Sequence, residues 1–140
     1  MQRRQLIQTT AALLATGASG WVGAQATAAW PDRPVKFILS QPPGSGPDNV
    51  ARLLSDRLAK ALGQAVVIEN KPGGQNVIGA QTAARAAPDG SSFYFATTAA
   101  LVTNRHLFKT MPYDPQKDFV AVAFIAKSPF AVLVRADSPI

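Results

Sequence analysis

The chain has 140 residues, 47% of them hydrophobic and 16% charged, which is the composition of an ordinary globular domain. The absence of cysteine excludes disulfides, thiolate metal sites and cysteine nucleophiles. The net charge is +6, but the basic residues are scattered and form no stripe with interleaved aromatic residues, so no nucleic-acid binding is expected.

Residues 1–26 follow the plan of an export signal. Arg3 and Arg4 give a basic start, residues 6–22 are apolar or small, and Ala24-Gln25-Ala26 is an A-x-A cleavage signal. The stretch is too short and too alanine-rich for a comfortable membrane span, so no stable membrane insertion is expected after its removal. The twin-arginine and general secretory routes both stay open, as does an amphipathic N-terminal helix. With either export route, the mature chain is predicted to lie in the periplasm of a bacterium.

Strand-like and helix-like runs alternate through the next part of the chain. Apolar runs at residues 35–39, 65–69 and 92–96 predict strands. A helix is expected between Asp48, its N-cap, and Gly63, which ends it. Leu53 should lie on the apolar face of this helix and Ser55 on the polar face. A small-residue helix is expected over residues 77–87. This order predicts an α/β fold with right-handed crossovers and a mostly parallel sheet flanked by helices.

The remainder is less regular. A short helix is expected near Asn104, then a proline-fixed loop over residues 111–115. Residues 120–125 and 130–134 are two further strand-like runs.

Each of the first two strands is followed by a glycine-rich turn, at residues 41–48 and 70–76. Such turns can place bare backbone N–H groups at the start of a helix, where the dipole favours negative charge. Ligands of parallel sheets bind beyond the carboxyl ends of the strands, so the turns and the threonines after the third strand should gather at one edge. The expected ligand-binding residues are Pro43, Gly44, Ser45, Gly46, Asp48, Gly73, Gly74, Gln75, Asn76, Thr97 and Thr98. The alternative is that these are simply tight strand-to-helix turns.

Other kinds of site lack their residues. The first turn lacks the Gly-Lys-Ser/Thr ending of a nucleotide-phosphate-binding loop. Asn49 occupies the position of the third glycine in the dinucleotide-binding motif. His106 is the single histidine and has no evident nucleophile or metal partner. No catalytic residue, metal site or cofactor is therefore predicted. For Asp48, a role as helix cap is predicted in preference to a catalytic role.

The residues resemble a known family of periplasmic solute-binding proteins, the receptors of tripartite tricarboxylate transporters, also called the Bug family. The resemblance runs from about Trp30 to the end of the chain. It is carried by WPDRP at residues 30–34, PPGSGPD ending at Asp48, VARLL at 50–54, ENKPGG from Glu69, IGA at 78–80, APDG at 87–90 and PYDP at 112–115.

The resemblance implies a two-lobed receptor of the type II binding-protein kind that closes on a small organic carboxylate. The first-lobe loops, here 43–48, 73–76 and 97–99, would hold one carboxylate through backbone groups and ordered waters, and the second lobe would supply most selectivity. The ligand would pass to a membrane permease, or the receptor would serve a sensor. In this chain Ser45 interrupts the expected glycines, Pro47 removes a donor, and Gln75 and Asn76 replace glycine in the second turn.

Members of that family are roughly twice as long. Residues 27–134 are therefore expected to be a first lobe and residues 135–140 the start of the crossover, with the second lobe missing. Residues 120–140 should then leave apolar strand surface unpaired, and the fragment should bind weakly. Two alternatives stay open: a small periplasmic enzyme that uses Asp48 and His106, and an interaction module that recruits a partner by edge pairing and has no ligand affinity.

Overall fold

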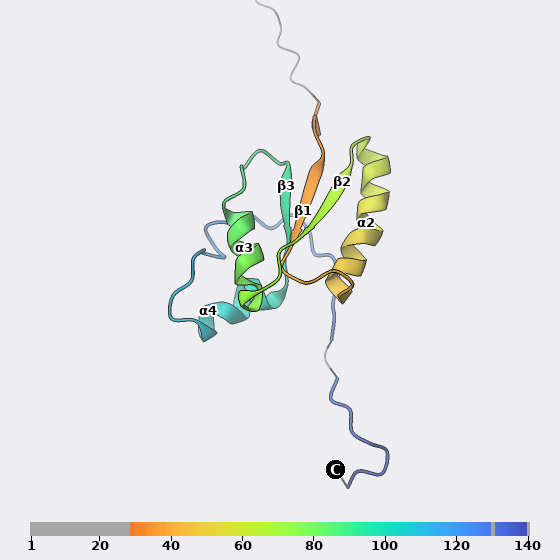
Figure 1. Ribbon diagram of the computed structural model, residues 1–140, viewed down its shortest axis with the longest axis vertical. Helices are drawn as coiled ribbons and strands as arrows, with labels where there is room; N and C mark the ends of the chain where they lie inside the picture. The colour runs from red at the N-terminus through yellow and green to blue at the C-terminus, as the bar shows by residue number, and fades with distance from the viewer. Residues whose placement is uncertain (1–28, 130, 140) are drawn as a thin grey trace, which may run out of the picture. The chain divides into compact units, whose positions relative to one another are not determined.

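Three short parallel strands form the centre of the fold (Figure 1). β1 (Val35–Leu39) lies in the middle, β2 (Val66–Asn70) pairs with one of its edges, and β3 (Ser92–Phe95) pairs with the other. The computed structural model describes residues 29–129 and 131–139, so the expected export signal lies outside the described residues. The prediction of an α/β fold with a parallel sheet is confirmed.

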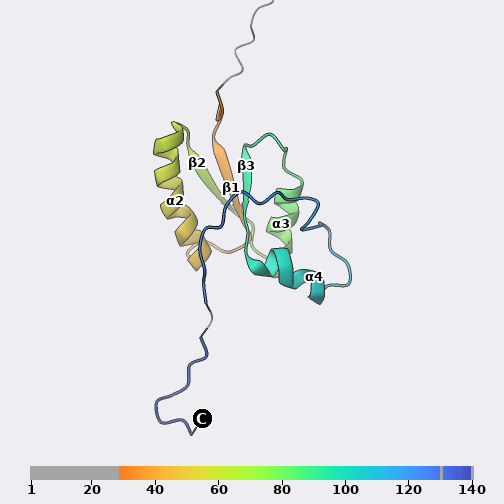
Figure 2. The same cartoon turned by 180° about the vertical axis from the view of Figure 1, so that it is seen from behind.

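The order β2-β1-β3 means that the chain reverses its direction across the sheet after β2. Right-handed crossovers in opposite directions put α2 (Gly46–Leu62) and α3 (Val77–Ala84) on opposite faces. In Figures 1 and 2 the two helices lie to either side of the strands. Three short helical segments complete the described elements: η1 (Gly74–Asn76), η2 (Ala99–Thr103) and α4 (Asn104–Leu107).

Most expected element boundaries lie within a few residues of the observed ones. β1 occupies the predicted residues, β2 is shifted by one residue, and β3 ends one residue early. α3 ends at Ala84, three residues before the prediction, and the Ala86 amide then donates to the Ala83 carbonyl, three residues earlier, which tightens the last turn. η2 was not anticipated.

The N-cap of α2 is Ser45, so the prediction of Asp48 as the cap is wrong. Ser45 has extended backbone, and its Oγ accepts from the Asp48 N–H at 3.4 Å. Asp48 is instead the third helical residue, which frees its carboxylate for other donors. Gly63, with φ of 66°, ends the helix as predicted.

The inward face of α2 also differs from the expected one. Leu53 is 61% exposed, whereas Ser55 is buried and donates through Oγ to the Arg52 carbonyl at 2.8 Å. Because that hydrogen bond satisfies its hydroxyl, Ser55 can replace an apolar residue in the packed face.

The core lies on both faces of β1. Val35, Ile38 and Leu39 are buried, and Ala80, Ala100 and Tyr113 form a buried cluster on the α3 side. Partly buried residues complete that cluster: Val77, Ala84, Tyr94, Met111 and Phe119. The phenol of Tyr113 donates to the Ala100 carbonyl at 2.6 Å, so its hydroxyl is satisfied inside the core.

α3 approaches the end of β1 closely at one glycine. A Cβ atom on Gly79 would lie 2.5 Å from Ser40 Oγ and 2.8 Å from Ser40 Cα. The side chain of Ser40 is held in turn by the Tyr94 hydroxyl at 2.5 Å. Only glycine fits at this crossing, which fixes how near α3 and the turn before it lie to the sheet.

The two strands expected in the C-terminal part are not observed. Residues 120–129 and 131–135 form no strand, and Figure 2 shows this blue segment as irregular chain. Strands need a hydrogen-bonded neighbour, and the sheet of the described residues contains only β1, β2 and β3. The apolar side chains are nonetheless exposed, for example Val122 at 77% and Leu133 at 89%.

Within residues 29–129 and 131–139, no helix combines the length and the hydropathy that a bilayer crossing requires.

Candidate functional site

The segments that follow β1, β2 and β3 meet at the carboxyl edge of the sheet. One side chain, Gln41, joins all three. Its Nε2 donates to Asn76 Oδ1 at 3.0 Å and to Thr97 Oγ1 at 3.4 Å. Its main-chain carbonyl accepts from Asn70 Nδ2 at 3.0 Å. The predicted gathering of the three turns is therefore confirmed.

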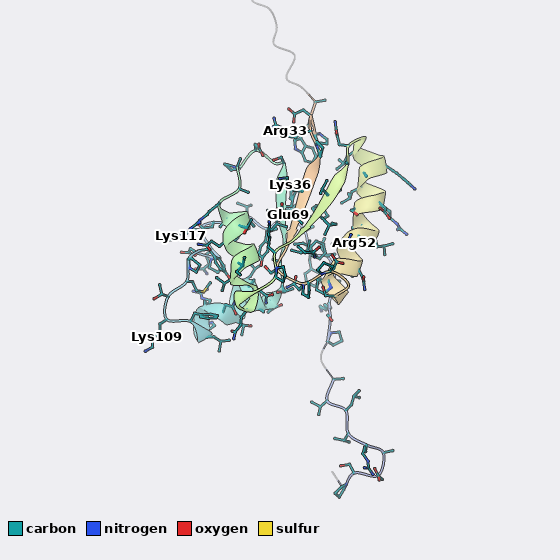
Figure 3. The ribbon with its side chains drawn as sticks, in the orientation of Figure 1. Arg33, Lys36, Arg52, Glu69, Lys109 and Lys117 are labelled. Carbon is teal, nitrogen blue, oxygen red and sulfur yellow. The ribbon has the colours of Figure 1, made fainter. Side chains whose placement is uncertain are left out.

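The carboxylate of Asp48 organises the first turn. Oδ2 accepts from the Gly44 amide at 2.8 Å and from Arg52 Nε at 2.9 Å, and Oδ1 accepts from Arg52 Nη2 at 3.1 Å and from Asn70 Nδ2 at 2.9 Å. The Arg52 guanidinium, labelled in Figure 3 on the first half of α2, together with the Gly44 amide and Asn70, holds the pKa of Asp48 far below its usual range.

This arrangement decides what Asp48 can do. Its side chain is only 1% exposed, and both of its oxygens are occupied. The carboxylate therefore shapes the turn and carries its charge balanced by Arg52, rather than facing a ligand.

The first turn offers fewer main-chain donors than expected. The Gly44 amide is taken by Asp48, the Ser45 amide donates to the Pro42 carbonyl at 3.3 Å, and Pro47 has no N–H. Gly46 is exposed, and within the described chain its amide makes no hydrogen bond. The expectation of several bare amides here is thus wrong, and one remains.

The second turn has the opposite character. Its last four residues all have positive φ, namely Gly73 at 122°, Gly74 at 54°, Gln75 at 52° and Asn76 at 75°. The glycines adopt these values without strain, and asparagine tolerates them, whereas the same conformation at Gln75 costs about 1–2 kcal/mol.

Two carbonyls of this turn accept hydrogen bonds from neighbouring segments, whereas three of its amides donate to no described residue. Asn104 Nδ2 donates to the Gln75 carbonyl at 2.7 Å, and Ser40 Oγ donates to the Asn76 carbonyl at 3.0 Å. Gly73, Gly74 and Gln75 are exposed residues, and their amides have no hydrogen-bond partner among the described residues. Successive N–H groups in a turn of this kind form a concavity that binds anions.

The third segment is already helical where a loop was expected. Thr98 has helical backbone angles, and η2 follows it directly. The Thr97 carbonyl accepts from the amides of Ala100 and Leu101 at 3.1 and 3.2 Å. The Thr97 hydroxyl faces Gln41, while Thr98 is exposed at the same edge.

The residues needed for the enzyme alternative are not brought together. Asp48 is enclosed by Gly44, Arg52 and Asn70, and His106 is exposed on α4. Among the described residues there is also no group of three or more histidine, cysteine or acidic side chains that could hold a metal ion.

Four residues that support the turns from behind were not among those predicted from the sequence. Ser40, Gln41, Asn70 and Asn104 bind main-chain or side-chain atoms of the turns, and Ser40 and Asn104 are buried. The available signal was their position, because Ser40 and Gln41 directly follow an apolar strand and Asn70 ends the next one.

With this geometry established, the relationship to known proteins is clear. Residues 50–140 match the model of the tripartite tricarboxylate transporter family receptor. The chain belongs to this family. It is 43% identical over 111 residues to a UPF0065 protein of Bordetella bronchiseptica, and the match covers 79% of this chain and 33% of that protein.

Solved structures give the same result. MatC from Rhodopseudomonas palustris with bound malate is 35% identical, with a TM-score of 0.65 over 69% of this chain and 33% of that one. A second R. palustris protein, solved with adipate, is 37% identical, with a TM-score of 0.60 over 62% of this chain and 29% of that one. The chain thus spans about a third of the length of these relatives.

Proposed function

We propose that this chain is the first lobe of a periplasmic receptor that binds a small organic carboxylate and delivers it to a tripartite tricarboxylate-type membrane permease. The observation that carries the proposal is that the amides of Gly73, Gly74 and Gln75, which are exposed residues, have no partner among the described residues, as is the case for the Gly46 amide at the start of α2. Main-chain N–H groups at a helix start or in such a turn bind carboxylate oxygens without a charged side chain.

The charges around this edge favour an anion. The Asp48 carboxylate is paired with Arg52, and Glu69 is paired with Lys71 at 2.9 Å. In Figure 3, Arg52 and Glu69 come from α2 and β2, the two elements beside the first turn. Neither acid therefore presents an uncompensated negative charge that would repel an anion at this edge.

The proposed ligand class is a dicarboxylate such as malate or adipate. Relatives solved with these two molecules match the fold of 62% and 69% of this chain, which supports the choice of ligand class. In the proposed assignment the first lobe comprises residues 27–134. Residues 1–26 direct the export of the chain to the periplasm. The residues proposed to touch the ligand are those of the second turn, Gly46 and Thr98.

The test is a titration of the isotope-labelled chain with malate and adipate, followed by amide chemical shifts. We expect saturable shifts concentrated at Gly46 and residues 73–76. Succinamide, which has similar length and no charge, serves as the control and should leave these amides unmoved. Shifts spread evenly over the surface, or equal shifts with succinamide, would count against the proposal.

One observation favours the alternative of an interaction module. Most apolar side chains of residues 120–129 and 131–134 are exposed, Val122 at 77% and Leu133 at 89% among them, and exposed apolar side chains in such number are typical of an interaction site. A second copy of the chain is the partner such a surface would take. Sedimentation at increasing concentration tests this, because a tight dimer with no malate-dependent shifts would replace the receptor proposal.

A further inference from the structure

Gln41 occupies the junction of the three segments at the candidate site. It directly follows Ser40 at the end of the central strand, so its main chain is anchored to the best-buried part of the sheet. Asn70 Nδ2 donates to its carbonyl at 3.0 Å and to Asp48 Oδ1 at 2.9 Å. The first turn is thereby connected to the end of β2.

The side chain of Gln41 continues this connection in the other direction. Its Nε2 contacts Asn76 Oδ1 and Thr97 Oγ1, which lie 35 and 56 residues away in sequence. Asn76 closes the left-handed turn whose amides are exposed, and Thr97 starts the helical segment on the third side. A continuous set of polar contacts therefore runs from Arg52 through Asp48, Asn70 and Gln41 to Asn76 and Thr97.

The oxygen of the Gln41 side-chain amide, unlike its nitrogen, connects no segments. This Oε1 atom is buried and has no hydrogen-bond partner among the described residues. A buried acceptor without a donor costs free energy, so the side chain adds little net stability to the fold. Its effect is to fix the positions of the turns.

We infer that Gln41 is a positioning residue that holds the second turn and the Thr97 segment in register with the first turn. Its consequence for ligand affinity rests on the proposed carboxylate-binding function. The positioning itself can be measured without any ligand.

The first measurement is amide hydrogen exchange of the whole chain. Four amides report on the two held segments, because Asn76 donates to Gly73, Val77 to Gly74, and both Ala100 and Leu101 to Thr97. In Gln41→Met, which removes both donors at similar size, exchange at these amides should rise about 3- to 10-fold. Exchange at Val35, which donates to Ala65 at the far end of β1, should not change.

Two further variants separate positioning from general damage. Gln116→Met makes the same change at an exposed glutamine whose hydrogen bond to Asp114 is made by its main chain, and it should leave all five amides unchanged. Gln41→Glu should restore exchange close to the wild-type rate, since the Asn76 amide can turn and the Thr97 hydroxyl can rotate to donate to the new carboxylate. Equal exchange in Gln41→Met and Gln116→Met would overturn the inference.

Malate titration is the second measurement. Gln41→Met should weaken malate binding several-fold because the donors are less well positioned. Gln41→Glu should weaken it as well, despite restored exchange, because it adds negative charge at the anion site. Unchanged malate affinity in a loosened Gln41→Met would overturn the role in binding. A wild-type chain that binds no malate would refute the proposed function, and the exchange result would still decide the positioning role by itself.

Discussion

Arg52 lies one helical turn after Asp48 and donates to both of its carboxylate oxygens, at 2.9 and 3.1 Å. The Arg52 guanidinium balances the charge of the buried Asp48 carboxylate, which can therefore stabilise the first turn. The same carboxylate then holds the Gly44 amide and the Asn70 side chain, so two turns depend on a single ionised group.

The first prediction concerns acid stability. The pKa of Asp48 is lowered in the folded chain by Arg52, the Gly44 amide and Asn70. A lowered pKa contributes stability that is present above the unfolded value, about 4, and is lost as pH falls toward the folded value. Unfolding by urea at a series of pH values should show this loss below about pH 4, and Asp48→Asn should be less stable at neutral pH and flatter in acid.

The control is Asp56→Asn, a change of the same kind at an exposed position of the same helix. It should keep both the neutral stability and the acid profile of the wild type. An Asp48→Asn variant whose acid profile matches that of wild type would show that this carboxylate does not support the turn.

The second prediction concerns the crossing of α3 over β1. Gly79→Ala should destabilise the fold by about 1–3 kcal/mol, because the added Cβ would meet both Oγ and Cα of Ser40. Adding Ser40→Gly should recover only part of this loss, since the contact with Cα remains. Thr82→Ala, on the same helix, should change stability much less, and equilibrium unfolding measures all three.

If Gly79→Ala were as stable as the wild type, α3 would have to lie farther from β1 than described. The second turn would then lose its backing, because Ser40 also holds the Asn76 carbonyl.

The third prediction concerns Tyr94. Burial raises the pKa of Tyr94 to about 12, partly offset by its hydrogen bond with Ser40. The phenol is neutral in the fold and ionises near pH 10 when unfolded, so its stabilising effect is complete below about pH 10 and is lost as pH rises toward 12. Tyr94→Phe should therefore reduce the alkaline loss of stability. An ultraviolet titration that shows every tyrosine ionising near pH 10 in the folded chain would contradict this.

The elements predicted correctly are those set by neighbouring residues. β1 is a run of apolar residues between a proline and the first turn, and Gly63 stops α2 because it adopts a left-handed conformation that other residues avoid. Likewise, the strand–helix alternation is sufficient to indicate a parallel sheet and the edge where its turns meet.

The parts that sequence analysis missed depend on distant partners. Serine and aspartate are both good caps, and the Asp48 carboxylate is bound instead by Asn70, which lies 22 residues away in sequence. Asn104 binds a carbonyl 29 residues earlier, a pairing with no local signal. Residues 120–125 and 130–134 are apolar runs typical of strands, but a strand needs a neighbouring strand, which a run of apolar residues does not supply.

The last prediction tests the single available amide of the first turn. Gly46→Pro removes this N–H while keeping a residue suited to the first position of a helix, and the extended backbone of Ser45 is compatible with a following proline. Gly46→Ala keeps the N–H and adds a similar Cβ, for which there is open space. Both variants place a Cβ atom next to Pro47, so the difference between their malate affinities reports on the N–H group alone.

Malate affinity measured by calorimetry should fall about tenfold in Gly46→Pro relative to Gly46→Ala, which is the usual loss for one hydrogen bond to a charged group. Folding of both variants is checked by their urea unfolding curves. Equal affinities would remove Gly46 from the site and leave the anion to the second turn alone. Equal affinities together with unmoved amides at residues 73–76 would mean that the carboxyl edge of this sheet does not bind the acid group.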